Sequence, residues 1–161
     1  MLEDALLDEA KALLALYDAR GLTLATAESC TGGLIAAALT SIAGSSSVVL
    51  GGFVTYSNAM KTKMVGVPDA LLEAVGAVSA EVAQAMAEGA LRETGADVAL
   101  SCTGIAGPSG ATPTKPVGLV FLGCARRGAA TRVERRVFPG DRSAVRAATV
   151  AEAFSLARAA A

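Results

Sequence analysis

Apolar residues recur at helical spacing near both ends of the chain. The segment over residues 2–20 has one apolar face, with acidic residues and Lys11 elsewhere, and Gly21 follows it. That face holds Leu6, Ala10, Leu13 and Tyr17. A second segment follows Asp141, and its apolar face holds Ala147, Val150, Ala151, Phe154 and Ala157. The spacing predicts an amphipathic helix at each end, the first ended by Gly21 and the last capped by Asp141.

Between these helices, short apolar runs bounded by glycine, proline and polar residues predict strands. The runs cover residues 22–27, 48–56, 97–104 and 117–125. Residues 131–138 alternate apolar and polar side chains, which is typical of an edge strand with one face in water.

Helical patterns separate the first three strands. They cover residues 32–43, a short segment that Ser57 could cap, another between Pro68 and Gly76, and a longer one that Ser79 caps and that runs to about Thr94. Because helices alternate with strands over most of the chain, residues 1–161 are expected to form one three-layer α/β/α domain. We expect a mostly parallel sheet with an antiparallel pair at one edge.

Composition narrows the function classes. The 161 residues are 53% hydrophobic but only 4% aromatic, and 14 basic residues stand against 15 acidic ones. This balance argues against a nucleic-acid partner that is bound through phosphate neutralisation. No apolar run is long enough to span a bilayer, and the first ten residues carry acids where a signal peptide carries Lys or Arg. We therefore expect a cytoplasmic protein without a membrane partner.

The chain has no histidine, and this absence removes Ser-His-Asp and Cys-His catalysis together with histidine-based metal sites. Its three cysteines are Cys30, Cys102 and Cys124, which form no CxxC pair. They predict neither a disulfide framework nor a zinc site. No cluster of Asp and Glu indicates a divalent metal, so we expect no metal and no cofactor.

Three polar or glycine-rich stretches follow three of the predicted strands: TAESCTGG (26–33), YSNAMK (56–61) and TGIAGP (103–108). In open α/β sheets, ligands bind beyond the carboxyl ends of the strands. The convergence of three such stretches on one edge predicts a ligand site there.

Ser29 is the first candidate for a nucleophile. It follows a strand and precedes Thr31, Gly32 and Gly33, where a helix is expected to begin. Unpaired backbone N–H groups at a helix start favour negative charge, so this turn could hold an oxyanion. Two alternatives stay open: Ser29 is a plain helix cap, or the neighbouring Cys30 is the nucleophile, which would need a cationic neighbour to form its thiolate.

Lys61 is the candidate base in a chain without histidine. Its neighbours are apolar enough to lower the lysine pKa by burial, and Ser-Lys pairs can replace Ser-His pairs. Lys63 lies two positions on and is expected to point elsewhere. The alternative for Lys61 is a solvated surface charge. Tyr56 could relay a proton or stabilise the oxyanion, or its ring could simply pack.

The loop that contains Thr103, Gly104 and Gly107 has backbone N–H groups that could surround an anion, although it lacks the GK[ST] ending of a Walker loop. Arg142 follows Asp141 in the first turn of the last helix, where it could reach a phosphate or carboxylate. An exposed surface arginine is the alternative. Together these residues suit one phosphate of a small ligand.

The chain resembles the CinA C-terminal domain family. The resemblance rests on TAESCTGG (26–33), IAGSSSVVLGGFVTYSNAMK (42–61), GAVS (76–79), TGIAGP (103–108), KPVGLVF (115–121) and FPGDR (138–142). It implies hydrolysis of the carboxamide of nicotinamide mononucleotide to nicotinate mononucleotide and ammonia. It also implies Ser29 as nucleophile, Lys61 as base and Tyr56 nearby.

Ser45 and Ser46 in AGSSS could form an anion pocket, so we place both at the ligand and leave open whether a serine of the 45–47 run is the nucleophile instead of Ser29. The resemblance further implies a homodimer and a small-molecule nucleotide as substrate. Longer relatives carry an additional N-terminal domain, which this chain is expected to lack. The alternative hypothesis to an amidase is a non-catalytic nucleotide-binding module linked to competence or DNA damage.

Overall fold

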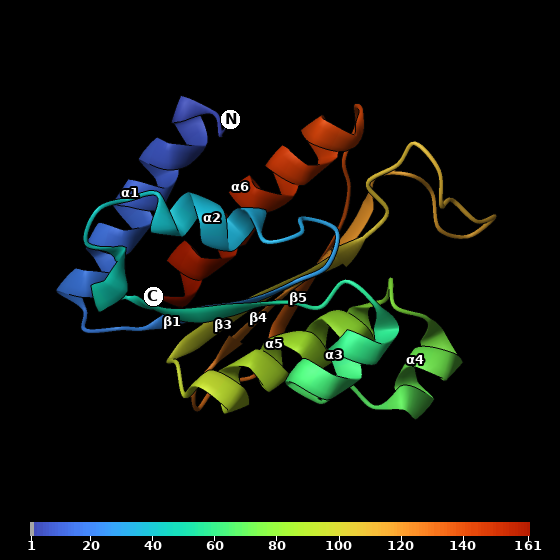
Figure 1. Ribbon diagram of the computed structural model, residues 1–161, viewed down its shortest axis with the longest axis horizontal. Coiled ribbons are helices and arrows are strands. Elements are labelled where there is room, and N and C mark those ends of the chain that lie inside the picture. Colours follow the sequence, from blue (N-terminus) through green and yellow to red (C-terminus); the bar gives the residue numbers. More distant parts are fainter. Residues whose placement is uncertain (1) are drawn as a thin grey trace.

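A five-stranded sheet divides the molecule into two helical layers in the computed structural model, which describes residues 2–161 (Figure 1). The strands are β1 (Leu24–Glu28), β2 (Val49–Val54), β3 (Val98–Gly104), β4 (Leu119–Arg126) and β5 (Arg132–Val137). The helices are α1 (Asp4–Ala19), α2 (Leu34–Thr40), the 3₁₀ turn η1 (Ser45–Ser47), α3 (Asn58–Val65), α4 (Asp69–Val75), α5 (Ala80–Thr94) and α6 (Arg142–Ala160).

The strand order in the sheet is β2-β1-β3-β4-β5. Strand β1 pairs in parallel with both β2 and β3, whereas β4 pairs antiparallel with both β3 and β5. Strand β5 therefore points the same way as the first three strands, and β4 alone is reversed. This confirms the expected three-layer α/β/α fold with a mostly parallel sheet and an antiparallel edge pair.

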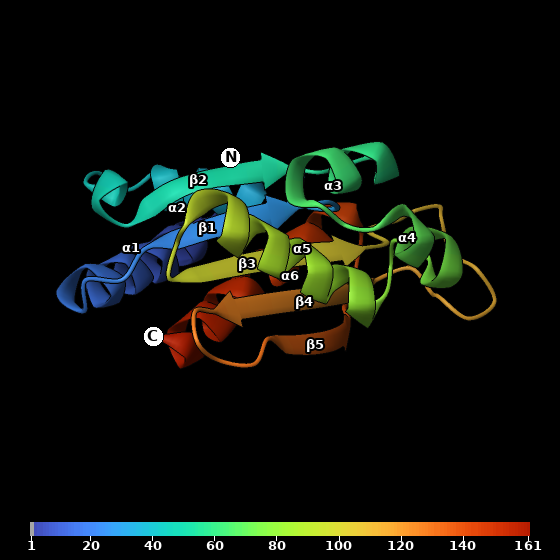
Figure 2. The ribbon, with the colours of Figure 1, turned by 90° about the horizontal axis from the view of Figure 1, so that it is seen from below.

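Each face of the sheet has its own hydrophobic core. Helices α1, α2 and α6 cover one face, and α3, α4 and α5 cover the other (Figure 2). Tyr17 and Phe154 are fully buried in the first core, where the Tyr17 hydroxyl donates to the carbonyl of Ala157 at 2.7 Å. Met86 is fully buried in the second core. Burying one such large apolar side chain stabilises the fold by about 1.5–3 kcal/mol.

Three predicted helix caps are confirmed. The side-chain oxygens of Ser57, Ser79 and Asp141 accept hydrogen bonds from the backbone N–H groups of Met60, Val82 and Ala144. Each cap satisfies an N–H group that has no partner inside the helix and contributes about 1 kcal/mol. The Asp141 cap fixes the start of α6 and thereby the position of Arg142.

Helix α2 starts later than the glycine pattern predicts. Gly32 and Gly33 have φ angles of 58° and 99°, which lie in the left-handed region, so the helix begins at Leu34 instead of residue 32. The buried Glu28 carboxylate accepts hydrogen bonds from the N–H groups of Ile35 and Ala36 at 2.9 and 2.8 Å. A carboxylate of the protein itself thus occupies the first free donors of α2.

The parallel strands deliver three chain segments to one edge of the sheet. Ser29 follows β1, Tyr56 comes two residues after β2, and Thr103 lies near the end of β3. Because β5 points the same way, α6 also begins at this edge. Within residues 2–161, no helix combines the length and the hydrophobicity that crossing a bilayer requires.

Candidate active site

A cavity of about 230 Å³ opens at the carboxyl edge of the parallel strands. Six of the residues predicted from the sequence line it: Ser29, Tyr56, Lys61, Thr103, Gly104 and Arg142. The structure thus brings together residues from the turn after β1, the β2–α3 turn, α3, β3 and α6. Within residues 2–161, no group of three or more His, Cys, Asp or Glu side chains is arranged to hold a metal ion.

Lys61 is buried at the floor of this cavity, with 1% of the residue exposed, although it carries an amine. Its Nζ lies 3.0 Å from Ser29 Oγ, 2.7 Å from the carbonyl oxygen of Thr55 and 3.4 Å from that of Tyr56. Burial lowers the pKa of Lys61 below 10.5, and the nearby sulfurs of Cys102 and Cys30 partly oppose this. Lys63, the comparison residue, is exposed.

The three neighbours of Lys61 determine how a neutral amine is oriented. A neutral amine has two N–H groups and one lone pair, and a carbonyl oxygen can only accept. When the two N–H groups donate to the Thr55 and Tyr56 carbonyls, the lone pair faces the Ser29 hydroxyl. The arrangement can therefore accept the hydroxyl proton of Ser29, which is what a general base does.

The turn after Ser29 differs from the expected oxyanion site. Thr31, Gly32 and Gly33 are not among the residues that line the cavity, and the Gly32 N–H already donates to the Ser29 carbonyl at 2.9 Å. The start of α2 is occupied by Glu28, as described above. Cys30, the residue directly after Ser29, does line the cavity.

The surroundings of Cys30 disfavour its thiolate form. Its hydrogen bond to the Cys102 thiol and its burial hold the Cys30 pKa well above 9.0. The thiolate, not the thiol, is the nucleophilic form of cysteine. Of the two adjacent candidates, Ser29 is therefore the one whose activation the surroundings favour.

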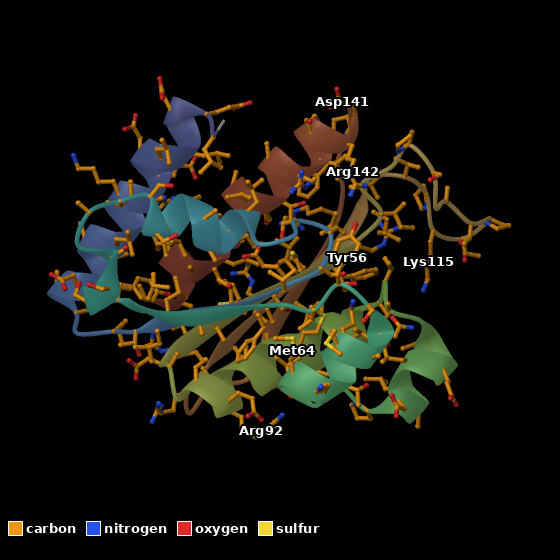
Figure 3. The ribbon with its side chains drawn as sticks, viewed as in Figure 1. Tyr56, Met64, Arg92, Lys115, Asp141 and Arg142 are labelled. Atoms are coloured by element: carbon orange, nitrogen blue, oxygen red, sulfur yellow. The ribbon has the colours of Figure 1, made fainter. Side chains whose placement is uncertain are left out.

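Arg142 joins two walls of the cavity at its rim. Its Nη1 donates to the Gly107 carbonyl at 3.0 Å and its Nη2 to the Tyr56 hydroxyl at 3.2 Å (Figure 3). The Tyr56 side chain is thus tied to an arginine, and the residue is 60% exposed. Gly107 takes part through its carbonyl, and the contact of Tyr56 with Lys61 is made by its backbone carbonyl.

Ser45 and Ser46 lie elsewhere, because the structure does not bring them to the cavity that holds Ser29 and Lys61. They form η1, which precedes β2, so they sit at the amino edge of the parallel strands. They line a separate cavity beside Lys11. The structure brings neither serine to Lys61, and Ser29 is the serine within hydrogen-bond reach of that amine.

Sequence reasoning assigned no role to four further residues that line the cavity, namely Asn58, Ala77, Val78 and Ala106. Each lies inside one of the stretches YSNAMK, GAVS or TGIAGP. Their position inside these stretches was the one feature of the sequence that could have indicated a place at the site. The side chains of Ala77, Val78 and Ala106 are small and apolar and carry no chemistry of their own, so only the fold shows that they wall the cavity.

The fold and the cavity define an α/β domain with a buried lysine–serine pair at the carboxyl edge of its parallel strands. The chain belongs to the CinA family, because the family model of the CinA C-terminal domain matches residues 7–161. It is 44% identical to a solved structure of a competence/damage inducible protein, CihA, from Agrobacterium tumefaciens, with a TM-score of 0.95 over 99% of this chain and 97% of that one.

Two further comparisons agree with this membership. Competence damage-inducible protein A (ComA) of Klebsiella pneumoniae is 36% identical, with a TM-score of 0.91 over 95% of each chain. A CinA-like protein of Citrifermentans bemidjiense is 60% identical over 129 residues, which are 80% of this chain and 31% of that protein. The chain thus spans about a third of the length of the curated relatives it matches.

Proposed function

We propose that the chain hydrolyses the carboxamide of nicotinamide mononucleotide to nicotinate mononucleotide and ammonia. The observation that carries the proposal is the buried Lys61 amine 3.0 Å from the Ser29 hydroxyl, inside a cavity that a small amide could enter. Membership of the CinA family supports nicotinamide mononucleotide as the substrate, because the resemblance to that family implies this substrate.

In the first step, Ser29 Oγ attacks the amide carbon and its proton moves to the Lys61 lone pair. Negative charge then develops on the former amide oxygen. We assign the backbone N–H of Cys30 as a hydrogen-bond donor to this oxygen. At a turn between a strand and a helix, the residue after the nucleophile often supplies such a donor. Burial of Lys61 favours this step, since only the neutral amine can take the proton.

In the second step, the Lys61 ammonium gives its proton to the departing amine, and the C–N bond breaks to release ammonia. The acyl group stays on Ser29 as an ester. Water then attacks this ester, with Lys61 again taking a proton and returning it to Ser29 Oγ. The products are the free enzyme and nicotinate mononucleotide.

We assign substrate binding to the apolar wall of the cavity and to its rim. Ala77, Val78 and Ala106 offer a small apolar surface for the pyridine ring. Arg142 presents a guanidinium at the rim, where it could pair with the phosphate. Its bond to the Tyr56 hydroxyl supports a role for Tyr56 in holding this arginine.

The direct test is ammonia release from nicotinamide mononucleotide by the wild-type chain and by Lys61→Ala. Losing the base is expected to lower kcat by about 10²–10⁴-fold, while circular dichroism shows an intact fold. Wild-type turnover in Lys61→Ala would end the Ser-Lys mechanism. A panel of other small amides separates this substrate from related ones.

A second candidate function is a nucleotide-binding module without catalysis. It is favoured by the names of relatives, such as the putative competence-damage inducible protein of Symbiobacterium thermophilum, which is 51% identical over 147 residues. Calorimetric binding of nicotinamide mononucleotide without ammonia release would support the module and exclude the amidase. The homodimer expected from the resemblance also remains a proposal, which sedimentation velocity can test.

A further inference from the structure

Helix α6 carries Arg142 and Arg146 one helical turn apart, and the two side chains contact different parts of the molecule. Arg142 lines the cavity, whereas Arg146 does not. The Arg146 guanidinium passes behind the turn that follows Ser29, where its Nη2 donates to the Thr31 carbonyl at 2.8 Å. A Cβ atom added at Gly32 would lie 3.7 Å from the same Nη2, so the guanidinium also packs against this glycine.

The Ser29 turn is held from two sides. On the inner side, the Thr31 hydroxyl donates to the Glu28 carboxylate, which is itself bound to the start of α2. On the outer side, the Thr31 carbonyl accepts from Leu34 N–H at 3.1 Å and from Arg146. Thr31 is fully buried between these contacts.

The environment of Arg146 is unusual for a structural arginine. It forms no salt bridge within residues 2–161, and its buried Nε has no hydrogen-bond partner there. A buried donor without a partner is unfavourable and calls for an explanation. The same guanidinium donates through Nη2 to one backbone carbonyl, that of Thr31, in the turn that carries Ser29.

We propose that Arg146 is a positioning residue that holds the Ser29 turn so that Ser29 Oγ stays within reach of Lys61 Nζ. It acts through the Thr31 carbonyl and touches neither the reacting atoms nor the cavity. Its effect on turnover rests on the proposed function, but its effect on the turn does not. Because it lies behind the turn, its loss should change kcat and leave KM nearly unchanged.

The kinetic experiment compares Arg146→Met, Arg146→Lys and Arg158→Met with nicotinamide mononucleotide as substrate. Arg158 is an exposed arginine on the same helix and serves as the matched control. Arg146→Met is expected to lower kcat by about 10–100-fold, since small misplacements of reacting groups have effects of this size. Arg146→Lys should recover part of the loss, and Arg158→Met should match the wild type.

Hydrogen exchange supplies a measure that does not depend on the substrate. In Arg146→Met, peptides covering residues 29–36 should exchange faster than in the wild type, while peptides from β3 and β4 stay unchanged. Unchanged exchange in the turn, or a uniform increase over the whole chain, overturns the proposal. If the wild type releases no ammonia, the amidase function fails, and the exchange result still decides the role of Arg146.

Discussion

The molecule contains two places where a lysine stands near serines, one at each edge of the sheet. At the carboxyl edge, Lys61 is 1% exposed and hydrogen-bonds Ser29. At the amino edge, Lys11 is exposed and lines a cavity with Ser45 and its neighbours. The cavity at the amino edge is the larger one, at about 570 Å³ against about 230 Å³.

Both places contain a lysine and serines, and they differ in how deeply the lysine is buried and in whether its amine contacts a serine. An exposed lysine keeps its charge at neutral pH and cannot accept a proton, however many hydroxyl groups surround it. For Lys61, burial favours the uncharged amine, while the two carbonyl oxygens orient its N–H groups. Cavity size alone would therefore favour the amino edge and not the edge that holds the lysine–serine pair.

The largest expected effect separates the two serines. Ser29→Ala removes the proposed nucleophile and should lower kcat for ammonia release by about 10⁴-fold or more. Ser45→Ala, at the other edge, should leave kcat within about twofold of the wild type, because a surface change away from the site is nearly neutral. A large loss in Ser45→Ala with full activity in Ser29→Ala would reverse the assignment of the two edges.

An intermediate effect is expected from the rim of the carboxyl-edge cavity. Arg142→Met should raise KM for nicotinamide mononucleotide by about 10–100-fold, the equivalent of one charge-assisted hydrogen bond. Nicotinamide riboside lacks the phosphate, so its kinetics should respond little to the change. Equal losses for both substrates would contradict a phosphate contact and indicate damage to the cavity itself.

The smallest effect concerns the pH dependence of stability. Because the Lys61 pKa is lowered on folding, the unfolded chain binds more protons between the folded pKa and 10.5. The free energy of unfolding of the wild type should therefore rise with pH over this window relative to Lys61→Met. Urea unfolding at several pH values measures the difference. A slope for Lys61→Met that is parallel to that of the wild type would show that folding does not lower the pKa of Lys61.

The arrangement of the strands and the lysine–serine pair could be predicted from local patterns. Short apolar runs, helix caps and the position of each polar stretch after its strand are properties of neighbouring residues. Ser57, Ser79 and Asp141 were predictable caps because the capping oxygen and the N–H it binds lie three residues apart. The meeting of Ser29 and Lys61 followed from the rule that parallel strands end at one edge.

Other parts of the site depend on contacts that no local pattern reveals. Arg146 reaches Thr31 across 115 positions of sequence, so nothing near either residue announces the contact. The pair Gly32–Gly33 looks like the start of a helix, yet both glycines have left-handed φ angles and α2 begins at Leu34. The buried carboxylate of Glu28 accepts from the N–H groups of Ile35 and Ala36 in the first turn of that helix.

The placement of Ser45 and Ser46 was within reach of sequence reasoning. The predicted strand at 48–56 already implied that residues just before it lie at the amino edge. The possible anion pocket in AGSSS took precedence over this simple argument, and the structure places both serines at the amino edge, as the chain direction implies.

The reversal of β4 has a consequence for how this domain could diversify. Since β3 ends and β4 begins at the same edge, the connection over residues 105–118 never crosses the sheet and carries no helix. Lengthening its exposed part, residues 108–114, has a small entropic cost. Insertions there would be an economical evolutionary route to a taller wall around the cavity, admitting bulkier nucleotides while the lysine and serine beneath stay fixed.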